Sequence, residues 1–317
     1  MRRFKNILVH CDAHSGYESL LDRVRWLARS NEASVTLIDV IETDASGLLN
    51  VFGAKSQADR AAMASKIEDA HRERIETVAS SLRGAGVEVE TTVRSGSAML
   101  EIIRRTMEHG HDLVMKAAQP QPNWPLLTSL DMHLIRKCPS AVWIVKSTAP
   151  AKATHILAAV DPDPDDSVRD RLNMTVMQLA TSLATADEAK LDVLNAWTLF
   201  EESALRHGRA KLKPQEVDAL VEDRRRVSEW RLNALAREFS AAHSGMRTFS
   251  VKGLPGDVIP EHAAADAVDT IVMGTVGRTG ISGLLIGNTA ETILSRVNCS
   301  VLTVKPEGFV SPVAPGA

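Results

Sequence analysis

Short runs of apolar residues alternate along the chain with longer segments whose apolar positions recur every three or four residues. Residues 5–14, KNILVHCDAH, and 154–163, THILAAVDPD, each contain an apolar run that reaches a carboxylate, and an amphipathic segment follows each of them. A run that is apolar throughout predicts a strand buried on both faces, and the wider spacing predicts helices. The chain is therefore expected to alternate strand and helix.

This alternation occurs twice. In the first half, the second strand is ASVTLIDVIE, a charged amphipathic helix follows at 56–83, and the last strand is in SAVWIVK. In the second half, the matching segments are AKLDVLNAWTLF, a helix at about 213–242, and SVLTVKP. Strands joined by crossover helices form parallel sheets with helices on both faces. We therefore expect an α/β protein of two tandem, doubly wound domains, each with five parallel strands, at 1–148 and 152–307, and a disordered tail at 308–317.

Composition and charge narrow the classes of function. Of 317 residues, 44% are hydrophobic and 24% are charged, and the net charge of −3 is typical of a globular protein. The chain has no excess of basic residues, so its composition does not favour nucleic acid as a partner. The mixed-charge segment EDRRRVSEW is typical of a solvated helix face. No apolar run reaches the ~18 residues of a membrane span, and no signal peptide is recognised. Three widely spaced cysteines are typical of buried, reduced thiols in a cytoplasmic protein.

A glycine-rich stretch, GTVGRTGISGLLIGNT at 274–289, lies between an apolar run and an amphipathic segment. Ligands of open parallel sheets bind beyond the carboxyl ends of the strands, where Asp161 ends the first strand of its half and Met273 and Gly274 end the fourth. A helix that begins near Asn288 would direct free N–H groups and a positive dipole at an anion. The pattern favours a phosphate site, although glycines at this point are also ordinary turn residues.

The glycines Gly274, Gly277 and Gly287 have the spacing G-x2-G-x9-G, and a polar pair follows them before the helix. This spacing, the early strand that ends in Asp161, the turn GLPGDVIPEHA and the closing CSVLTVKP resemble the nucleotide-binding branch of the universal stress protein family. The resemblance covers residues 4–306. It implies a Rossmann-like, adenine nucleotide alpha hydrolase-like fold, dimerisation through the last strand, and ATP bound with its adenine near the first two strands.

The resemblance also assigns ligand positions residue by residue. Asp161 would meet the ribose or a Mg²⁺ ion, and the backbone at the glycines would meet the phosphates. Asn288 stands where the family has a small hydroxyl residue, and Thr289 follows it. The expected cofactor is ATP, with or without Mg²⁺. The expected binding residues are Val160, Asp161, Met273, Gly274, Val276, Gly277, Gly287, Asn288 and Thr289.

The first half keeps an aspartate, Asp12, at the end of its first strand but lacks the glycine spacing. Lys116 stands at the position we assign to Gly274, no glycine occurs from residue 117 to 146, and three prolines lie in the loop that follows Lys116. A backbone cradle for phosphate cannot form there in the same way. We interpret this half as a degenerate, structural domain, with a different ligand as the alternative.

We expect a stress-response protein that binds ATP or a related nucleotide in its C-terminal domain and acts through ligand-modulated contacts with protein partners. Two alternatives remain: a weak ATP hydrolase at the same site, and a regulatory or structural protein that binds a non-nucleotide ligand through the N-terminal domain. No catalytic residue is assigned, because G-x-S-x-G is missing and local spacing shows no general base. The last strands, AVWIV and VLTV, are expected to pair as a pseudo-dimer within the chain, with a homodimer as a further option.

Overall fold

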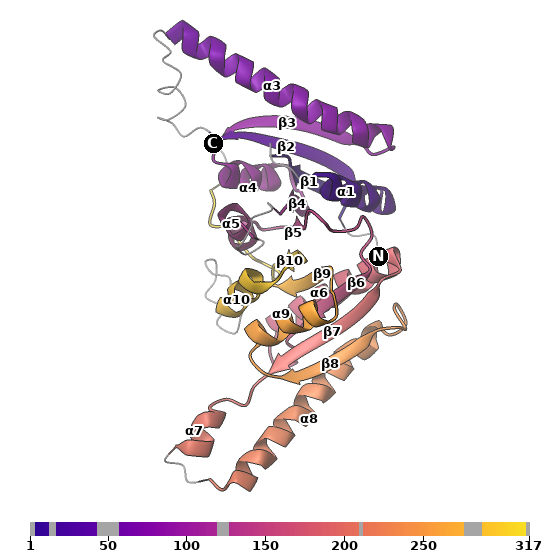
Figure 1. Cartoon of the computed structure of the whole chain (residues 1–317), viewed down its shortest axis with the longest axis vertical. Helices are drawn as coiled ribbons and strands as arrows, with labels where there is room; N and C mark the ends of the chain where they lie inside the picture. The colour runs from indigo at the N-terminus through magenta and orange to yellow at the C-terminus, as the bar shows by residue number, and fades with distance from the viewer. Residues whose placement is uncertain are drawn as a thin grey trace. The chain divides into compact units, whose positions relative to one another are not determined.

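The computed structural model describes residues 4–12, 17–42, 57–118, 127–208, 212–275 and 287–314, with side chains from residue 61 onward in the helix that begins at 57. The chain folds as two compact units (Figure 1). The first unit is built on Met1–Ala151 and includes Phe309–Ala317, and the second is built on Lys152–Gly280 and includes Ile286–Gly308.

The first unit is a parallel sheet of five strands, which lie in the order β3-β2-β1-β4-β5. Each connection contains a helix and crosses over to a parallel strand, and the connection through α4 joins β3 to β4, which are not neighbours in the sheet. The elements are β1 (Asn6–His10), α1 (Tyr17–Asn31), β2 (Ser34–Glu42), α3 (Gln57–Gly84), β3 (Val89–Gly96), α4 (Ala98–His109), β4 (Leu113–Ala117), α5 (Ser129–Lys137) and β5 (Ala141–Val145).

The second unit repeats this topology, with the strands in the order β8-β7-β6-β9-β10, all parallel. A short helix, α7, precedes the long helix α8 (Figure 1). The elements are β6 (His155–Ala159), α6 (Ser167–Asp187), β7 (Lys190–Trp197), α7 (Glu202–His207), α8 (Pro214–Phe239), β8 (Arg247–Lys252), α9 (Pro255–Ala265), β9 (Thr270–Gly274), α10 (Asn288–Arg296) and β10 (Ser300–Val304).

The central strands of both sheets are buried along their length. Ile7, Leu8 and Val9 of β1 and Ile156 and Leu157 of β6 all have exposed fractions of 0%. Because successive residues of a strand point to opposite faces, continuous burial means that both faces of each sheet are covered. The predicted fold class, an α/β protein with two five-stranded parallel sheets, is thus confirmed.

The strand register corrects one assignment in the first half. In the first unit Ile7 of β1 pairs with Leu113 of β4, and the corresponding pair in the second unit is Ile156 of β6 with Thr270 of β9. Three residues after Leu113 and Thr270, Lys116 corresponds to Met273. The next residues, Ala117 and Gly274, therefore correspond to each other. The sequence analysis matched Lys116 to Gly274 and was wrong by one position, because the apolar runs LVM and IVM can be aligned in either register by composition alone.

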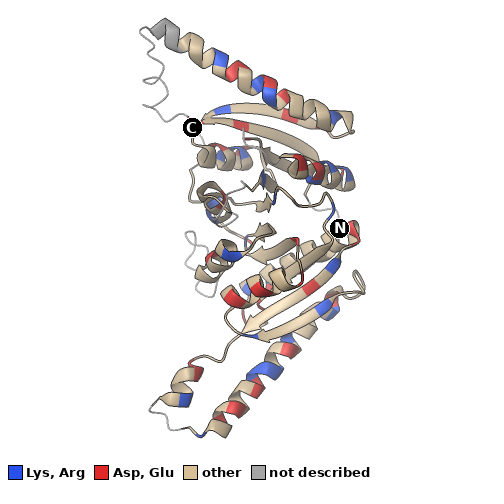
Figure 2. Ribbon diagram, in the orientation of Figure 1, with Lys and Arg blue, Asp and Glu red and all other residues tan. Residues whose placement is uncertain are grey.

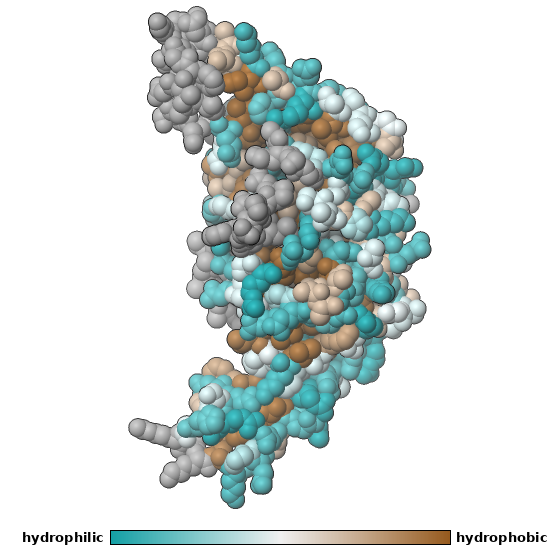
Figure 3. Space-filling view, viewed as in Figure 1, coloured by the Kyte–Doolittle hydropathy of each residue, from teal (hydrophilic) through white to brown (hydrophobic). Residues whose placement is uncertain are grey.

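The two long helices α3 and α8 carry residues of both charges (Figure 2). Over their described residues, neither helix presents a stripe of one sign, and hydrophilic residues dominate the face of the molecule in Figure 3. Large hydrophobic side chains such as Phe200 and Trp230 are nevertheless exposed. Within the described ranges, no helix combines the length and apolar content that a membrane crossing requires.

Residues 309–314 lie within the first compact unit. The Ser311 hydroxyl donates to the carbonyl of Lys137 over 2.7 Å, and Val313 is buried. These contacts anchor the beginning of the segment that the sequence analysis expects to be a disordered tail.

Candidate functional site

The chain turns at Asp161 as it leaves β6, and Asn173 of α6 fixes this turn. The Asp161 N–H donates to the Asn173 Oδ1 over 3.0 Å, and the Asn173 amide donates to the Asp161 carbonyl over 2.8 Å. Asn173 is buried, so water does not compete for these hydrogen bonds. The Asp161 side chain, in contrast, is 42% exposed and presents its carboxylate beyond the end of the strand.

Val160, which precedes this turn, is held by β7. Its N–H donates to the Leu194 carbonyl over 3.0 Å, and its carbonyl accepts a hydrogen bond from the Asn195 side chain, also over 3.0 Å. Asn195 in turn accepts a hydrogen bond of 2.7 Å from the Ser228 hydroxyl of α8. A buried polar network therefore connects the end of β6 to α8.

Two arginines from different helices hold the acidic turn that follows β6. Arg169 of α6 places its Nη1 2.8 Å from Asp163 Oδ2 and 3.5 Å from Asp161 Oδ2. Arg231 of α8 lies 3.0 Å from Asp163 Oδ1 and 3.0 Å from Asp165 Oδ2. The turn thus bridges α6 and α8, and Asp163 is shared by both guanidinium groups.

The same turn caps α6. The Asp166 carboxylate accepts hydrogen bonds of 3.1 Å from the backbone N–H groups of Arg169 and Val168. The bond from Arg169 lowers the pKa of Asp166, and its guanidinium and the bond from Val168 add to this effect. The carboxylate therefore stays ionised where the positive end of the helix dipole favours negative charge.

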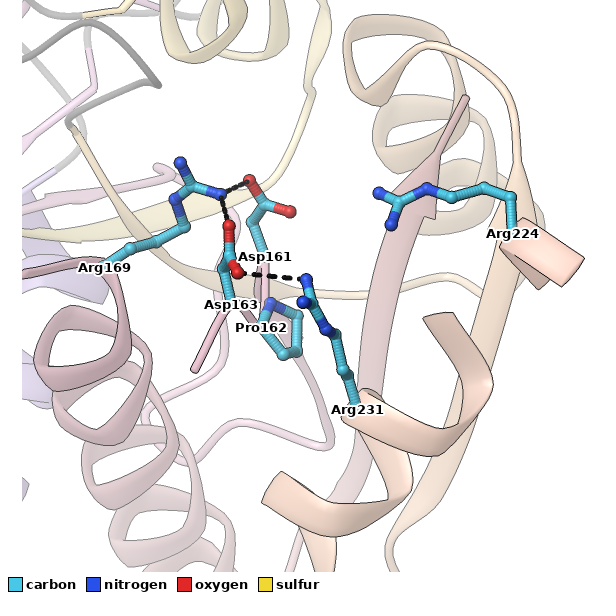
Figure 4. A pocket seen from close by; sticks show the side chains of 6 residues that line it. All are labelled: Asp161, Pro162, Asp163, Arg169, Arg224 and Arg231. Atoms are coloured by element: carbon cyan, nitrogen blue, oxygen red, sulfur yellow. Dashed lines mark hydrogen bonds and ion pairs between the residues drawn. The ribbon is translucent and has the colours of Figure 1, made fainter. Parts of the chain in front are cut away.

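A cavity of about 210 Å³ lies between the acidic turn and α8 (Figure 4). Its lining residues are Asp161, Pro162, Asp163, Arg169, Arg224 and Arg231. Figure 4 shows Arg224 reaching from α8 toward Asp161. Arg169 and Arg231 are both paired with carboxylates, whereas Arg224 forms no ion pair with any residue that the structure describes. Arg224 is therefore the cation of this cavity that is available to a ligand.

Sequence reasoning missed the two arginines of α8. It interpreted the segment 222–230, which contains Arg224 but not Arg231, as a solvated helix face, and this holds for Arg225 and Arg226, since both pair with Glu222 along the helix. No local pattern distinguishes Arg224 from these neighbours. Only the folding of α8 beside the distant acidic turn separates the three.

The fourth strand of this unit ends next to the first. Ala159 of β6 is paired with Met273 of β9, so Val160 and Gly274 continue two neighbouring strands at the same edge of the sheet. Met273 is buried. A Cβ atom at Gly274 would lie 2.6 Å from Leu172 Cδ2 of α6, which is closer than carbon atoms can approach. A side chain at position 274 would therefore force the Leu172 side chain of α6 to shift.

Helix α10 begins at the same edge. The Thr275 N–H donates to the Val304 carbonyl over 3.1 Å, and the Gly287 N–H donates to the Thr275 carbonyl over 3.1 Å. Gly287 is the N-cap and Asn288 is the first residue within the helix. A glycine N-cap has no side chain to accept hydrogen bonds from the first turn, so the N–H groups of this turn are open to a ligand.

The structure therefore brings together six of the nine predicted residues at the ends of β6 and β9 and the start of α10, and Thr289 follows in the first turn of α10. The six are Val160, Asp161, Met273, Gly274, Gly287 and Asn288. The other two predicted residues, Val276 and Gly277, lie outside the described residues.

The matching edge of the first unit is neutralised internally. Lys116 has an exposed fraction of 1%, and its Nζ lies 3.0 Å from Asp131 Oδ1 and 3.9 Å from Asp12 Oδ2. It also donates to the Ala117 carbonyl over 2.9 Å. The carboxylates of Asp12 and Asp131 thus neutralise the Lys116 ammonium group, which is not available to pair with an anionic ligand.

His10 lies at the end of β1 beside this ion pair. Burial lowers the pKa of His10 to about 4, with a further contribution from the ammonium group of Lys116. Burial likewise raises the pKa of the neighbouring Cys11 thiol, aided by the Asp39 and Asp12 carboxylates. Asp39 itself pairs with His71 over 2.8 Å and with Arg74. The His10 imidazole and the Cys11 thiol are thus held neutral.

Comparisons with known proteins agree with the repeat. The model of the universal stress protein family matches residues 3–146 and 152–305. Universal stress protein E of Escherichia coli (strain K12) is 30% identical over 233 residues, which cover 72% of this chain and 72% of that protein. The universal stress protein E homolog of Haemophilus influenzae is 26% identical over 315 residues, which cover 96% of this chain and 98% of that protein.

Solved structures share the fold over most of the chain. A crystal structure from Pseudomonas aeruginosa UCBPP-PA14 has a TM-score of 0.68 and 25% identity, and covers 96% of this chain and 95% of that chain. A universal stress protein from Archaeoglobus fulgidus DSM 4304 has a TM-score of 0.64 and 15% identity, over 96% of this chain and 99% of that chain. Because the family model matches each half separately, this protein belongs to the universal stress protein family, with two such domains in tandem.

Proposed function

We propose that this protein is a cytoplasmic stress-response protein whose second unit binds ATP or a related nucleotide, and that occupancy modulates its contacts with protein partners. One observation carries the proposal: Asp161, Gly274 and the start of α10 lie at the carboxyl ends of the neighbouring strands β6 and β9. Ligands of open parallel sheets bind at this edge.

The acidic end of the site suits a ribose or a Mg²⁺ ion. The Asp161 carboxylate is partly exposed, and its backbone is fixed by Asn173, so it is held in place without being shielded from a ligand. A carboxylate accepts hydrogen bonds from ribose hydroxyls and is a preferred ligand of Mg²⁺. The Arg169 guanidinium lies 3.5 Å from it and places a positive charge beside it.

The helix end of the site suits phosphates. The N–H groups of the first turn of α10, which includes Asn288 and Thr289, are donors for phosphate oxygens, and the helix dipole favours negative charge there. Gly287 carries no side chain that would stand between the backbone and a phosphate. The proposal extends to Val276 and Gly277, which complete the glycine spacing but lie outside the described residues.

Helix α8 supplies a physical route from occupancy to a partner. Arg224 and Arg231 both line the cavity, and Arg231 is held by the acidic turn that begins at Asp161. A ligand that engages Asp161 or Arg224 alters the charge balance between this turn and α8. We therefore propose the exposed face of α8 as the surface whose partner contacts respond to the nucleotide.

Binding is favoured over turnover. Hydrolysis requires a base that can accept a proton from the attacking water. Of the two carboxylates in the described lining, Asp163 contacts two guanidinium groups, and Asp161 is the one we assign to the ribose or Mg²⁺. The proposal is therefore a ligand-binding module rather than a hydrolase.

Equilibrium binding of labelled ATP to the purified full chain, with and without Mg²⁺, tests the proposal. We expect saturable binding that Gly277→Val weakens, because a branched side chain obstructs the approach of a phosphate to the backbone. Gly84→Val is the control, since no atom lies within 4 Å of a Cβ at Gly84, which ends a helix in the other unit. Absence of saturable binding, or equal affinity in Gly277→Val, would refute it.

A further inference from the structure

A cluster of ionisable side chains lies at the edge of the second sheet opposite to Asp161, where the strands begin. Asp192 is the third residue of β7, and its carboxylate is fully buried. His155 begins β6, and Arg247 begins β8. His262 lies in α9, and Asp266 is the C-cap of this helix. Neither the nucleotide proposal nor the family match explains why these groups gather at one point.

Asp192 is the centre of the cluster. Its two oxygens each lie 2.8 Å from a nitrogen of Arg247, and its Oδ2 lies 3.1 Å from His262 Nε2 and 3.0 Å from His155 Nε2. Burial alone would raise the pKa of Asp192, but the hydrogen bonds from Arg247 and His262 outweigh it and lower this pKa. The carboxylate is therefore ionised.

The hydrogen bonds define where the proton of His155 lies. His155 Nδ1 is 2.9 Å from the backbone carbonyl of Asp266, which can only accept, so Nδ1 carries a proton. In a neutral imidazole the lone pair of Nε2 then faces the Asp192 carboxylate. His155 is 6% exposed, and its Nε2 has no hydrogen-bond partner among the described residues. The 3.0 Å contact between Nε2 and the Asp192 carboxylate therefore needs a positive charge, carried by a proton on Nε2 or by a cation bound at the carboxylate.

His262 repeats this arrangement. When its Nε2 donates to Asp192, its Nδ1 lone pair faces the Asp266 carboxylate, whose Oδ2 lies 3.7 Å away. Two carboxylates and two imidazoles thus surround one guanidinium, that of Arg247, whose Nη2 is also 3.7 Å from Asp266 Oδ1. The carboxylate oxygens and ring nitrogens of this cluster are the donor atoms that a bound cation requires.

The spacing of the donor atoms suits a metal ion. Asp192, His262 and Asp266 each offer one ligand atom, and these atoms all lie within 4.8 Å of one another. Metal–ligand bonds of about 2.0–2.1 Å place donors roughly 3.3 Å apart in a tetrahedron, so the three donors must draw together around the ion, and water takes the fourth position. Imidazole and carboxylate donors together suit zinc and its first-row neighbours. His155, held by the carbonyl of Asp266, orients the Asp192 carboxylate from its other side.

We propose that Asp192, His262 and Asp266 bind a divalent first-row transition metal, with Zn²⁺ as its representative. Arg247 is the competing cation. Its side chain is 50% exposed, so it can move into solvent when the metal takes its place on Asp192. The metal would connect β7 to α9 at the edge remote from the nucleotide, so this inference stands independently of the proposed function.

Zinc titration of the metal-free full chain against a chromophoric chelator tests this site. We expect His262→Gln and Asp266→Asn each to lose one equivalent of bound Zn²⁺, while both variants keep the helical circular dichroism of the parent. His207→Gln is the matched control, because His207 is exposed on α7 and distant in sequence from the cluster. Equal zinc stoichiometry and affinity in the parent, His262→Gln and Asp266→Asn would overturn the proposal.

Arg247→Gln provides an independent test. Removal of the competing guanidinium leaves the negative charge of the cluster without compensation, so Zn²⁺ should bind at least about tenfold more tightly. If the cluster were only an ion-pair network, Arg247→Gln would lower the unfolding temperature, and Zn²⁺ would not restore it. That result would also overturn the proposal.

Discussion

Leu172 of α6 fills the space that a side chain at position 274 would need. A Cβ at Gly274 would lie 2.6 Å from Leu172 Cδ2 and 2.9 Å from its Cγ. The first glycine of the G-x2-G-x9-G spacing therefore has a packing role at the end of β9, whatever ligand the site binds. Glycine spacing alone does not separate the two roles, but substitution does.

Gly274→Ala should lower the free energy of unfolding by about 1–3 kcal/mol, because the methyl group overpacks the contact with Leu172. Leu172→Ala in the same chain should recover part of this loss, since it removes the atoms that clash. Urea unfolding of both single variants and the double variant measures the coupling. Strictly additive effects would mean that Leu172 is not what excludes a side chain at 274.

Lys116→Met should lower the free energy of unfolding by about 3–5 kcal/mol, because it leaves the fully buried Asp131 carboxylate without its cation. Addition of Asp131→Asn should recover part of the loss, since it removes the uncompensated charge. Lys66→Met, on the exposed face of α3, should change stability by less than about 0.5 kcal/mol. A small effect of Lys116→Met would show that the ion pair is not buried in solution.

The buried histidines predict loss of stability at acidic pH. Burial lowers the pKa of His10 and of His111 to about 4 from 6.5, with Lys116 and Arg105 respectively adding to the effect. Between these two values the unfolded chain binds more protons than the folded chain, so stability falls as the pH decreases from about 6.5 to about 4. Urea unfolding across this range should show a shallower pH dependence in His10→Gln than in the parent. An unchanged pH dependence would contradict the burial of a neutral His10.

Arg224→Ala should weaken nucleotide binding by about tenfold, because it removes the cavity cation that has no carboxylate partner among the described residues. Arg226→Ala is the matched control, since Arg226 is a neighbour on the same helix and pairs with Glu222 away from the cavity lining. Fluorescence titration with a labelled ATP analogue measures both. Equal losses in the two variants would indicate a general charge effect rather than a contact in the cavity.

The sequence predicts the fold well because periodicity and repeat act together. Short continuous apolar runs such as the one at Ile7–Val9 are typical of strands buried on both faces, and the two halves provide this signal twice. The Asp161 position follows from the same rule, since a carboxylate that ends a buried strand must emerge at the sheet edge. The register was harder, and Lys116 was matched one residue out, because neighbouring apolar residues are interchangeable in composition but not in strand pairing.

The rest of the candidate site depends on long-range contacts that no local pattern encodes. Arg224 belongs to a run of three arginines, and only the fold directs one of them to the acidic turn. Asp192 and His262 are likewise remote in sequence and meet only because α9 packs beside β7. The residues next to them in the sequence form no recognisable motif. From the sequence alone they are therefore interpreted as surface charges or as polar residues of a strand.

The stoichiometry of ATP binding tests the central claim most directly. Asp161 and Asp12 end equivalent strands, but only the second unit has the glycine spacing, and Lys116 already neutralises the edge that contains Asp12. Calorimetric titration should give one ATP per chain, with affinity reduced at least about tenfold in Asp161→Asn and unchanged in Asp12→Asn. Two ATP per chain, or equal affinity in Asp161→Asn and the parent, would contradict a nucleotide site confined to the second unit.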